Sequence, residues 1–372
     1  MMHRITCVVG ARPNFIKVAA IIREFRGRDN WTCRLVHTGQ HYSPEMSGSF
    51  FEDLEIPPPD VNLEVRGGSH TQQTASIMMA IEPDLINHRP DLLLVVGDVN
   101  STMAASLVAA KLGIPIAHVE AGLRSGDRTM PEEINRIVTD GISDYLFVSE
   151  PSGQLNLERE GVPPEKIFFV GNVMIDTLLC FREKAAASTV LERLNCRPGH
   201  YVVATLHRPS NVDDDRRLEQ LARMLTELSR DIPVVFPVHP RTEQRLAPVW
   251  LSGGQVRLTP PLGYLDFLCL TSQARLVLTD SGGIQEETTI LGVPCLTVRE
   301  NTERPATIDQ GTNLLVGVDP VHVLREAKAA LQRPPSSEVR RPDRWDGMAS
   351  RRIRETLEEL LAARAGVAPA LL

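Results

Sequence analysis

The sequence predicts an α/β protein with two doubly wound domains that face a cleft. Short apolar runs recur through both halves of the 372 residues and alternate with stretches of helical spacing. These runs are apolar throughout, which is typical of parallel strands covered on both faces of a sheet. At roughly 150 residues per domain, a chain of this length holds two such domains.

Five apolar runs in the first half predict the strands of the first domain. They cover residues 5–9, 92–96, 116–119, 145–148 and 167–170. Residues 101–112 lie between two of these runs and have the apolar spacing of a helix. The alternation of strand and helix predicts a parallel sheet with helical crossovers.

The second half repeats this arrangement. Its expected strands cover residues 201–206, 234–238, 256–258, 276–279 and 295–298, and a helix is expected at 217–228. We place the domain boundary after Asn172, so that the domains cover residues 1–172 and 173–344. The last helical stretch, within residues 345–372, has one apolar side, and we expect it to pack back on the first domain.

Composition and charge exclude several classes of partner. The chain has 40 Lys and Arg residues against 47 Asp and Glu residues, so no basic surplus favours nucleic acid or an anionic membrane. No apolar run is long enough to span a bilayer, and no signal peptide is evident. Six scattered cysteines without a CxxC pair predict reduced thiols in a cytoplasmic protein with no zinc site.

The first strand ends in a glycine turn that carries two cations. Arg12 and Lys17 follow Gly10 at the expected start of a helix. Helix N-terminal amides and two cations would bind an anion, and the alternative is a solvated basic helix face. Neither a GxGxxG dinucleotide fingerprint nor a P-loop is present, so no cofactor is expected.

Carboxylates follow the next two strands. Asp98 comes directly after one apolar run and Glu120 lies at the end of the next. Asp98 alone would suit a helix N-cap, and Glu120 would be costly to bury unless it pairs with Arg124 or His118. Because parallel strands end at one edge of the sheet, two such carboxylates favour an acid/base site instead.

A third carboxylate stands at the start of a predicted helix. Thr129 and Glu132 have the spacing of a capping box, which is as good an explanation of Glu132 as catalysis. Glu132 and Arg136 are four residues apart and share a helix face. A carboxylate and a cation at one helix start extend the predicted acid/base cluster.

The second half also places polar residues after its strands. His207 and His239 each end a strand, and two such histidines favour a functional site. Ser281, Gly282 and Gly283 form a turn into a helix, where backbone amides can approach a phosphate closely. One turn further, Glu287 would accept hydrogen bonds from two ribose hydroxyls, and Arg304 would add a cation. The alternative is a glycine loop that merely turns tightly.

A possible metal-binding DxD occurs at residues 213–215. It comes just before a predicted helix and not at the end of an apolar strand. Acidic residues at that place favour a solvated helix N-terminus, because they complement the positive end of the helix dipole. No metal is therefore expected there.

Taken together, these motifs resemble one enzyme family. They are GARPNFIK (10–17), GD (97–98), HVEAGLR (118–124), PEEINR (131–136), LHRP (206–209), PVHP (237–240), DSGGIQEE (280–287) and TERP (302–305). Their order and spacing are similar to those of the non-hydrolysing UDP-N-acetylglucosamine 2-epimerases. The resemblance implies two Rossmann-like domains in a GT-B-like fold and a cytoplasmic homodimer that interconverts UDP-GlcNAc and UDP-ManNAc.

The resemblance also assigns roles to individual residues. The family's catalytic groups fall on Asp98, Glu120, Glu132 and His207. Its UDP and phosphate contacts fall on Arg12, Lys17, Arg136, His239, Ser281, Gly282, Gly283, Glu287 and Arg304. A second ligand site, used by some bacterial members for activation, would fall on Gln40, Glu133 and Arg208.

Some positions depart from the bacterial pattern of the family. Ala11 and Asn14 stand where many bacterial members have threonine and glutamate. The surroundings of Gln40 also differ, so activation by a second UDP-sugar stays open. Relatives that act on UDP-diacetamido-uronic acids share this opening, which leaves the substituents of the sugar open. A GT-B glycosyltransferase would share the UDP pocket and is a further alternative.

The chemistry of the reaction sets requirements that these residues meet. The C2–H bond of a UDP-sugar has no adjacent carbonyl, so C1–O cleavage must first develop positive charge that acidifies it. Loss of the proton gives a glycal, and UDP returns after protonation on the other face. The carboxylates and His207 would move the proton. Arg12, Arg136, Arg304 and the amides at Ser281 would retain UDP without a metal.

Overall fold

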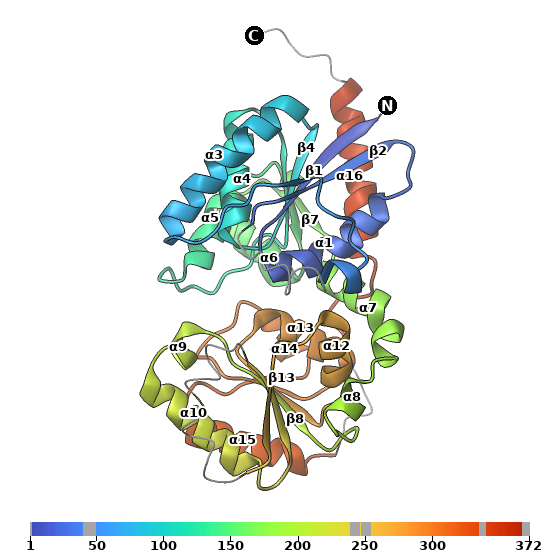
Figure 1. Ribbon diagram of the computed structural model, residues 1–372. Helices are drawn as coiled ribbons and strands as arrows, with labels where there is room; N and C mark the ends of the chain where they lie inside the picture. Colours follow the sequence, from blue (N-terminus) through green and yellow to red (C-terminus); the bar gives the residue numbers. More distant parts are fainter. Residues whose placement is uncertain (1, 40–49, 239–245, 247–253, 335–339, 367–372) are drawn as a thin grey trace. The chain divides into compact units, whose positions relative to one another are not determined.

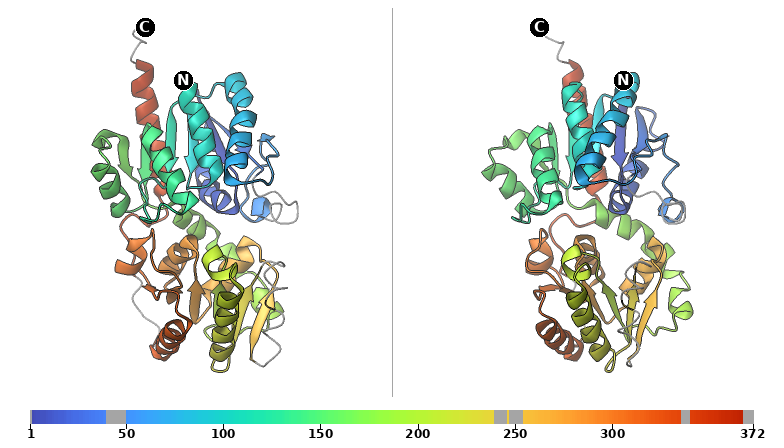
Figure 2. Two further views of the ribbon diagram at one scale, coloured as in Figure 1. Left: turned by 90° about the vertical axis from the view of Figure 1, so that its left-hand side faces the viewer. Right: turned by 60° about the vertical axis from the view of Figure 1, so that its left-hand side comes forward.

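The computed structural model describes residues 2–39, 50–238, 246, 254–334 and 340–366. The chain divides into two compact units, one formed by residues 1–180 with 343–372 and the other by 181–342. In each unit a central parallel sheet is flanked by helices (Figures 1 and 2). The predicted α/β class with two doubly wound sheets is confirmed, and the cleft stays a prediction.

The first unit contains a seven-stranded parallel sheet among its described residues, in the order β3-β2-β1-β4-β5-β6-β7. Its strands are β1 (His3–Val9), β2 (Trp31–His37), β3 (Val61–Asn62), β4 (Leu92–Val96), β5 (Ile116–Val119), β6 (Tyr145–Val148) and β7 (Ile167–Phe169). Its helices are α1 (Arg12–Phe25), α3 (His70–His88), α4 (Asn100–Lys111), α5 (Pro131–Ile142), α6 (Pro151–Arg159), η1 (Pro164–Lys166) and α16 (Ala349–Gly366). All five predicted strands are present, and β2 and β3 were not predicted.

The second unit contains a six-stranded parallel sheet in the order β10-β9-β8-β11-β12-β13, again among described residues. Its strands are β8 (Val202–Thr205), β9 (Val234–Pro237), β10 (Val256–Thr259), β11 (Leu276–Thr279), β12 (Cys295–Thr297) and β13 (Asn313–Leu315). Its helices are α8 (Val190–Arg193), α9 (Pro209–Val212), α10 (Asp215–Leu228), α12 (Tyr264–Ser272), α13 (Gly282–Leu291), α14 (Pro305–Asp309) and α15 (Pro320–Gln332). Here β13 is the strand that was not predicted.

The helix α7 (Val173–Ala186) contains the division between the units. The predicted boundary, after Asn172, lies before this helix, whereas the compact units divide between Cys180 and Phe181 within it. The final helix, α16, is part of the first unit and contacts α1. Arg354 of α16 pairs with Glu24 of α1 at 2.8 Å, and Trp31 donates a hydrogen bond to Glu358 of α16 at 3.1 Å.

Both sheets have the strand order of a classical doubly wound fold. The direction in which successive strands are added reverses between β1 and β4 in the first unit and between β8 and β11 in the second. At such a switch point the loops after two neighbouring strands run to opposite sides of the sheet and leave a crevice for ligands. The residues after these four strands are therefore the place to look for a site.

Candidate active site

In the first unit, Asn14 joins the turn after β1 to the end of β4. Its side-chain oxygen accepts hydrogen bonds from the backbone N–H groups of Gly10 and Ala11 at 3.2 and 3.0 Å. Its amide donates to the carbonyl of Val96 at 2.9 Å. A side chain at position 10 would lie within 2.0 Å of Ser101 Oγ, so only glycine fits this turn. Asn14, which departs from the family pattern, is thus the third residue of α1 and accepts the N–H of the N-cap residue Ala11, as in a capping box.

Lys17 and Glu120 form a buried ion pair. Lys17 Nζ lies 2.7 Å from Glu120 Oε2, and the two side chains are 7% and 3% exposed. A Cβ at Gly97 would lie 2.8 Å from Nζ, so glycine makes room for the ammonium group. The expectation that Glu120 pairs with Arg124 or His118 is wrong, and so is a solvated face for Lys17. An opposite charge this close favours the ionised form of a carboxylate.

Glu120 also has an unusual backbone conformation. Its φ is +72°, in the left-handed region that non-glycine residues seldom adopt. The backbone N–H groups of Glu120 and Ala121 both donate to the carbonyl of Phe147, at 3.0 and 3.1 Å. Such a conformation costs about 1–3 kcal/mol and persists where neighbouring contacts fix it, often at functional sites.

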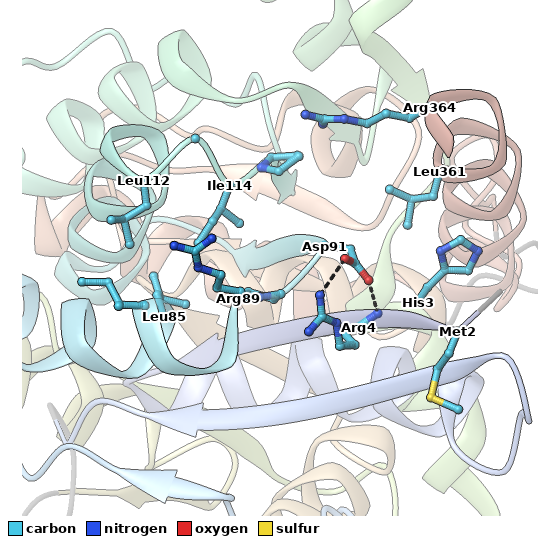
Figure 3. Close-up of a pocket in the computed structure, with 14 residues that line it drawn as sticks. Met2, His3, Arg4, Leu85, Arg89, Asp91, Leu112, Ile114, Leu361 and Arg364 are labelled. Carbon is cyan, nitrogen blue, oxygen red and sulfur yellow. Dashed lines mark hydrogen bonds and ion pairs between the residues drawn. The ribbon is translucent and has the colours of Figure 1, made fainter. Parts of the chain in front are cut away.

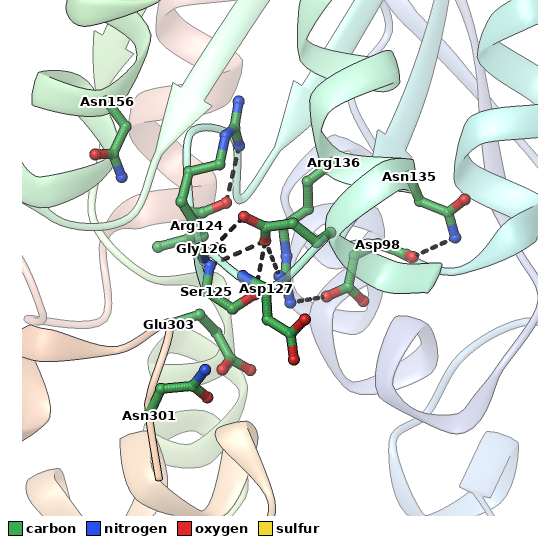
Figure 4. A network of polar contacts seen from close by, with 12 residues as sticks. Asp98, Arg124, Ser125, Gly126, Asp127, Asn135, Arg136, Asn156, Asn301 and Glu303 are labelled. Atoms are coloured by element: carbon green, nitrogen blue, oxygen red, sulfur yellow. Dashed lines mark hydrogen bonds and ion pairs between the residues drawn. The ribbon is translucent and has the colours of Figure 1, made fainter. Parts of the chain in front are cut away.

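Arg136 holds two carboxylates at the start of α5 (Figure 4). It donates to Asp98 Oδ2 at 2.5 Å and to Glu133 Oε2 at 2.9 Å, with its own side chain buried. The N-cap of α4 is Val99, so the alternative interpretation of Asp98 as a helix cap is wrong. Asp98 instead lies beside a cation at the carboxyl end of β4.

Glu133 anchors the loop that precedes α5. Its carboxylate accepts the backbone N–H groups of Ser125 and Gly126, at 2.9 and 3.0 Å. Burial raises the pKa of Glu133, but these bonds and the one from Arg136 outweigh it, and the pKa is lowered overall. Glu133, which the family resemblance assigns to a second ligand site, thus fixes the loop that leads into its own helix.

Glu132 has no such partners. It is half-buried in the first turn of α5, and its carboxylate makes no hydrogen bond or ion pair with any described residue. The N-cap of α5 is Met130 and no side chain caps this helix, while the Thr129 hydroxyl bonds to Asp127 at 2.6 Å. The capping-box interpretation of Glu132 is therefore wrong.

Arg12 is the first residue of α1, where the anion site was predicted. Its guanidinium carbon lies 4.4 Å from the centre of the Phe50 ring, in a cation–π arrangement. Burial lowers the pKa of Arg12 from its usual value. Partly desolvated cations of this kind bind anions more strongly than exposed ones, because the local dielectric is lower.

In the second unit, Asp280 fixes the position of His207. Asp280 is fully buried after β11, and its carboxylate lies 2.8 Å from His207 Nδ1. It also accepts the backbone N–H groups of His207 and Arg208 at 3.0 and 2.9 Å. Burial raises the pKa of Asp280, but the bonds from His207 and its neighbours outweigh it and lower the pKa overall.

This arrangement leaves the other ring nitrogen of His207 outward. The side chain of His207 is 63% exposed, so the ring is accessible to a ligand or to water. A carboxylate at Nδ1 orients a histidine and stabilises its charged form, as in catalytic triads. Asp280 was missing from the predicted site, although its place directly after a buried strand and before two glycines was the available signal.

Glu287 is buried on α13 with one oxygen that lacks a partner. Its side chain is almost fully buried, and Oε1 has no hydrogen bond within the described part of the chain. Burial raises the pKa of Glu287 to about 7, and a hydrogen bond from Tyr264 opposes this only in part. A buried acceptor without a donor is costly, which is typical of a group that awaits a ligand.

The predicted serine and glycines form the N-terminus of α13, with Ser281 before the helix and Gly282 and Gly283 as its first two residues. Ser281 is the N-cap of this helix but makes no side-chain cap hydrogen bond. Its backbone N–H donates to Thr279 Oγ1 at 3.0 Å, which leaves the next N–H groups at the helix start for an anion.

Further arginines of the second unit are paired with buried glutamates. Arg304 Nε lies 2.7 Å from Glu286 Oε1, and both side chains are buried. Arg208 lies 3.5 Å from Glu303, which also pairs with Arg299 at 2.8 Å. Gln40 and His239 lie outside the described residues.

The DxD sequence lies at the start of α10. Asp214 caps this helix by accepting the N–H of Arg217 at 2.8 Å, which confirms the helix-terminus interpretation of the DxD sequence.

A pocket of the first unit lies away from these residues (Figure 3). It has a volume of about 790 Å³ and is lined by residues at the amino ends of β1, β4 and β5, such as Arg4, Asp91 and Pro115. The predicted site residues follow the carboxyl ends of strands, at the opposite edge of the sheet.

Within the described ranges, no helix is long and apolar enough to cross a membrane, and no group of three potential metal ligands occurs.

Two doubly wound units with polar residues at both switch points define a nucleotide-binding class of α/β protein. The family model described as UDP-N-acetylglucosamine 2-epimerase matches residues 23–358. The chain therefore belongs to the UDP-N-acetylglucosamine 2-epimerase family, as its motifs predicted.

Individual relatives are similar over most of their length. A UDP-N-acetylglucosamine 2-epimerase of Methanocaldococcus jannaschii is 42% identical over 89% of this chain and 93% of its own. A UDP-2,3-diacetamido-2,3-dideoxy-D-glucuronate 2-epimerase of Pseudomonas aeruginosa is 40% identical over 96% of this chain and all of its own. The crystal structure of the M. jannaschii enzyme with UDP-GlcNAc and UDP has a TM-score of 0.88 at 40% identity, covering 96% of this chain and 99% of its own.

Proposed function

We propose that the protein interconverts UDP-N-acetylglucosamine and UDP-N-acetylmannosamine through elimination and re-addition of UDP. The observation that carries this proposal is the pair of carboxylates after neighbouring strands β4 and β5, each beside a buried cation. Asp98 is held by Arg136 and Glu120 by Lys17. Charge neutralisation by these cations allows two carboxylates to stay ionised in one partly buried region, as proton transfer at C2 requires.

The second unit would bind the nucleotide in this proposal. The amides after Ser281 suit the diphosphate, and Glu287 suits the ribose hydroxyls because its buried Oε1 needs donors. Arg304 and Arg12 would neutralise the leaving UDP, and His239 would add a contact. The pairs Lys17–Glu120 and Arg136–Asp98 suggest a second task for those two cations, which is to hold the acid/base groups.

Glu132 and His207 would complete the proton transfers. Glu132 has a carboxylate without a partner among the described residues, and His207 presents Nε2 while Asp280 holds Nδ1. In one direction a base removes the C2 proton as the C1–O bond breaks, which gives a glycal and UDP. In the other, an acid protonates C2 from the opposite face and UDP returns to C1.

The similarity to the P. aeruginosa relative supports a second substrate candidate. A 40% identity to a diacetamido-glucuronate 2-epimerase is close to the 42% identity to UDP-N-acetylglucosamine 2-epimerases. Both reactions invert C2 of a UDP-sugar, so the same acid/base groups would serve either sugar.

As the family resemblance implies, we infer a cytoplasmic homodimer. Sedimentation of the purified protein would test the dimeric state.

The test is incubation of the purified protein with each UDP-sugar alone, without NAD or added metal. The proposal expects UDP-ManNAc to form from UDP-GlcNAc until equilibrium, with a higher kcat/KM than for the diacetamido-uronate. A glycosyltransferase would yield no new UDP-sugar without an acceptor. Activity that chelator abolishes and one divalent ion restores would contradict the metal-free mechanism.

A further inference from the structure

We propose that His118 and Asp140 form a positioning pair that sets the two turns from which Asp98 and Glu120 project. Neither residue was part of the predicted site. Both are buried, with His118 on β5 and Asp140 on α5. The inference rests on the proposed function, because it concerns the placement of the proposed acid/base groups.

His118 connects β5 to the loop after β4. Its Nε2 lies 2.8 Å from the carbonyl oxygen of Gly97, the residue before Asp98. The N–H of Gly97 donates to the carbonyl of Val119 at 3.0 Å, and Gly97 has a φ of +67°. The Gly97 peptide groups are thus held from both sides, which fixes the point where Asp98 leaves the sheet.

Asp140 connects α5 to the loop after β5. One carboxylate oxygen lies 2.6 Å from His118 Nδ1. The other accepts the N–H of Gly122 at 3.1 Å and pairs with Arg124 at 2.7 Å. His118 and Gly122 stand two residues before and two residues after Glu120, so Asp140 holds both sides of the left-handed Glu120 turn.

The hydrogen bonds also define the charge of this pair. Both ring nitrogens of His118 face acceptors, so both carry a hydrogen when both bonds form. Burial raises the pKa of Asp140, but His118 and Arg124 outweigh it and lower the pKa overall, so Asp140 supplies the matching negative charge. Arg124 is balanced in turn by Glu160 at 2.7 Å. The charges alternate in sign along this chain of contacts, which makes their burial tolerable.

The pair touches no reacting atom in the proposed mechanism, so its loss should act through geometry. A misplacement of about 1 Å at a reacting centre can cost about a hundredfold in rate. We therefore expect D140N to lower kcat by about ten- to a hundredfold, with KM and the Kd for UDP changed less than about threefold.

Asp144 offers a matched control. Its carboxylate accepts the N–H of Ile116 at 2.9 Å, so it also holds β5, but at the amino end of the strand. D144N should lower Tm less than D140N, because Asp140 is buried and also pairs with His118 and Arg124, and it should leave kcat unchanged. If the role of Asp140 were only structural, both variants would lose stability and neither would lose kcat.

The experiment measures kcat, KM and Tm for the full-length wild type, D140N and D144N with UDP-GlcNAc. A tenfold or larger fall in kcat for D140N alone supports the inference, and a kcat within twofold of wild type overturns it. If the wild type itself forms no epimer, the proposed function fails, and the two failures are thereby distinguished.

The wild-type protein provides a readout that does not depend on a variant folding. With ¹⁵N-labelled histidines, NMR should show an imidazole whose two ring nitrogens both carry slowly exchanging hydrogens. The absence of such an imidazole would overturn the inference, because His118 could not then make both bonds.

Discussion

The two units share one sheet topology but treat the charges at their switch points differently. In the first unit, two of the predicted carboxylates are paired with buried cations, since Lys17 pairs with Glu120 and Arg136 with Asp98. In the second unit, Glu287 is buried with an oxygen that no described residue satisfies. The side chain of the N-cap residue Ser281 likewise makes no hydrogen bond to the start of α13.

The difference shows how one fold supports two tasks. Groups that move protons need fixed geometry and a defined charge, which internal ion pairs provide. Groups that bind a ligand need unsatisfied capacity, because a donor or acceptor already engaged has less to gain from the ligand. We therefore expect most acid/base groups of the proposed reaction in the first unit and most nucleotide contacts in the second.

The largest expected effect is on turnover, from Glu132 in the first unit. Because Glu132 has no partner among described residues, E132Q should leave the fold intact while it removes an acid/base group. A general acid or base contributes about 10²–10⁴-fold, so kcat should fall by that factor while UDP still binds. Steady-state kinetics and UDP titration would check this. A fully active E132Q would remove Glu132 from the acid/base set.

The next effect is on stability, from the buried pair Lys17–Glu120. K17M leaves Glu120 buried without its cation, and breaking such a pair costs roughly 3–5 kcal/mol of unfolding free energy. The double variant K17M/E120Q should recover most of that loss, because no uncompensated charge remains. Urea unfolding of wild type and both variants would check this. A stable K17M with weakened UDP binding would instead make Lys17 a phosphate ligand.

The sequence predicted the strands that are apolar throughout and missed strands that carry polar side chains. Continuous apolar runs predicted strands such as β4, whereas β2 and β13 carry polar side chains at Arg34 and Asn313 and were missed. The parallel topology expected from those runs was enough to place Asp98 and Glu120 at one edge of the sheet.

The partners of these residues could not be predicted in the same way. The Lys17–Glu120 pair depends on how α1 packs beside Gly97, which local spacing does not encode. The spacing of Thr129 and Glu132 matched a capping box, but α5 begins one residue later than that motif requires, with Met130 as its N-cap. Asp280 was not among the predicted site residues, because its bonds to His207 form only once β8 and β11 pair.

A smaller effect, on the pH dependence of UDP binding, tests the open acceptor of the second unit. With a pKa of about 7, Glu287 must lose a proton before it can accept two ribose hydroxyls. Affinity for UDP should therefore rise about tenfold from pH 6 to pH 8 through this group. The ionised form is disfavoured in the fold, so without ligand this group lowers stability as pH rises from about 4.5 to 7.

E287Q is the control for this dependence. It keeps the shape of the side chain and cannot titrate, so the difference between the two pH profiles isolates Glu287 from the titration of UDP itself. Isothermal titration calorimetry at several pH values would measure both. Parallel pH profiles of UDP affinity for wild type and E287Q would show that Glu287 does not contact the nucleotide.

The smallest expected effect comes from an acidic residue of the second unit outside its switch point. Asp214 caps α10, so D214A should lower the unfolding free energy by about 1 kcal/mol. Turnover should stay at the wild-type value, since a helix cap takes no part in chemistry. Thermal unfolding together with kcat measures this, and a large loss of rate would revive a functional role for the DxD sequence.

The central claim is that carboxylates of the first unit exchange the proton at C2 of the sugar. Proton NMR of UDP-GlcNAc with the wild-type protein in heavy water tests it most directly. The account predicts that the C2 proton signal disappears as the epimer forms, because solvent deuterium enters at C2, and that E132Q slows this loss by about 10²–10⁴-fold. An epimer that keeps its original C2 proton would contradict the account.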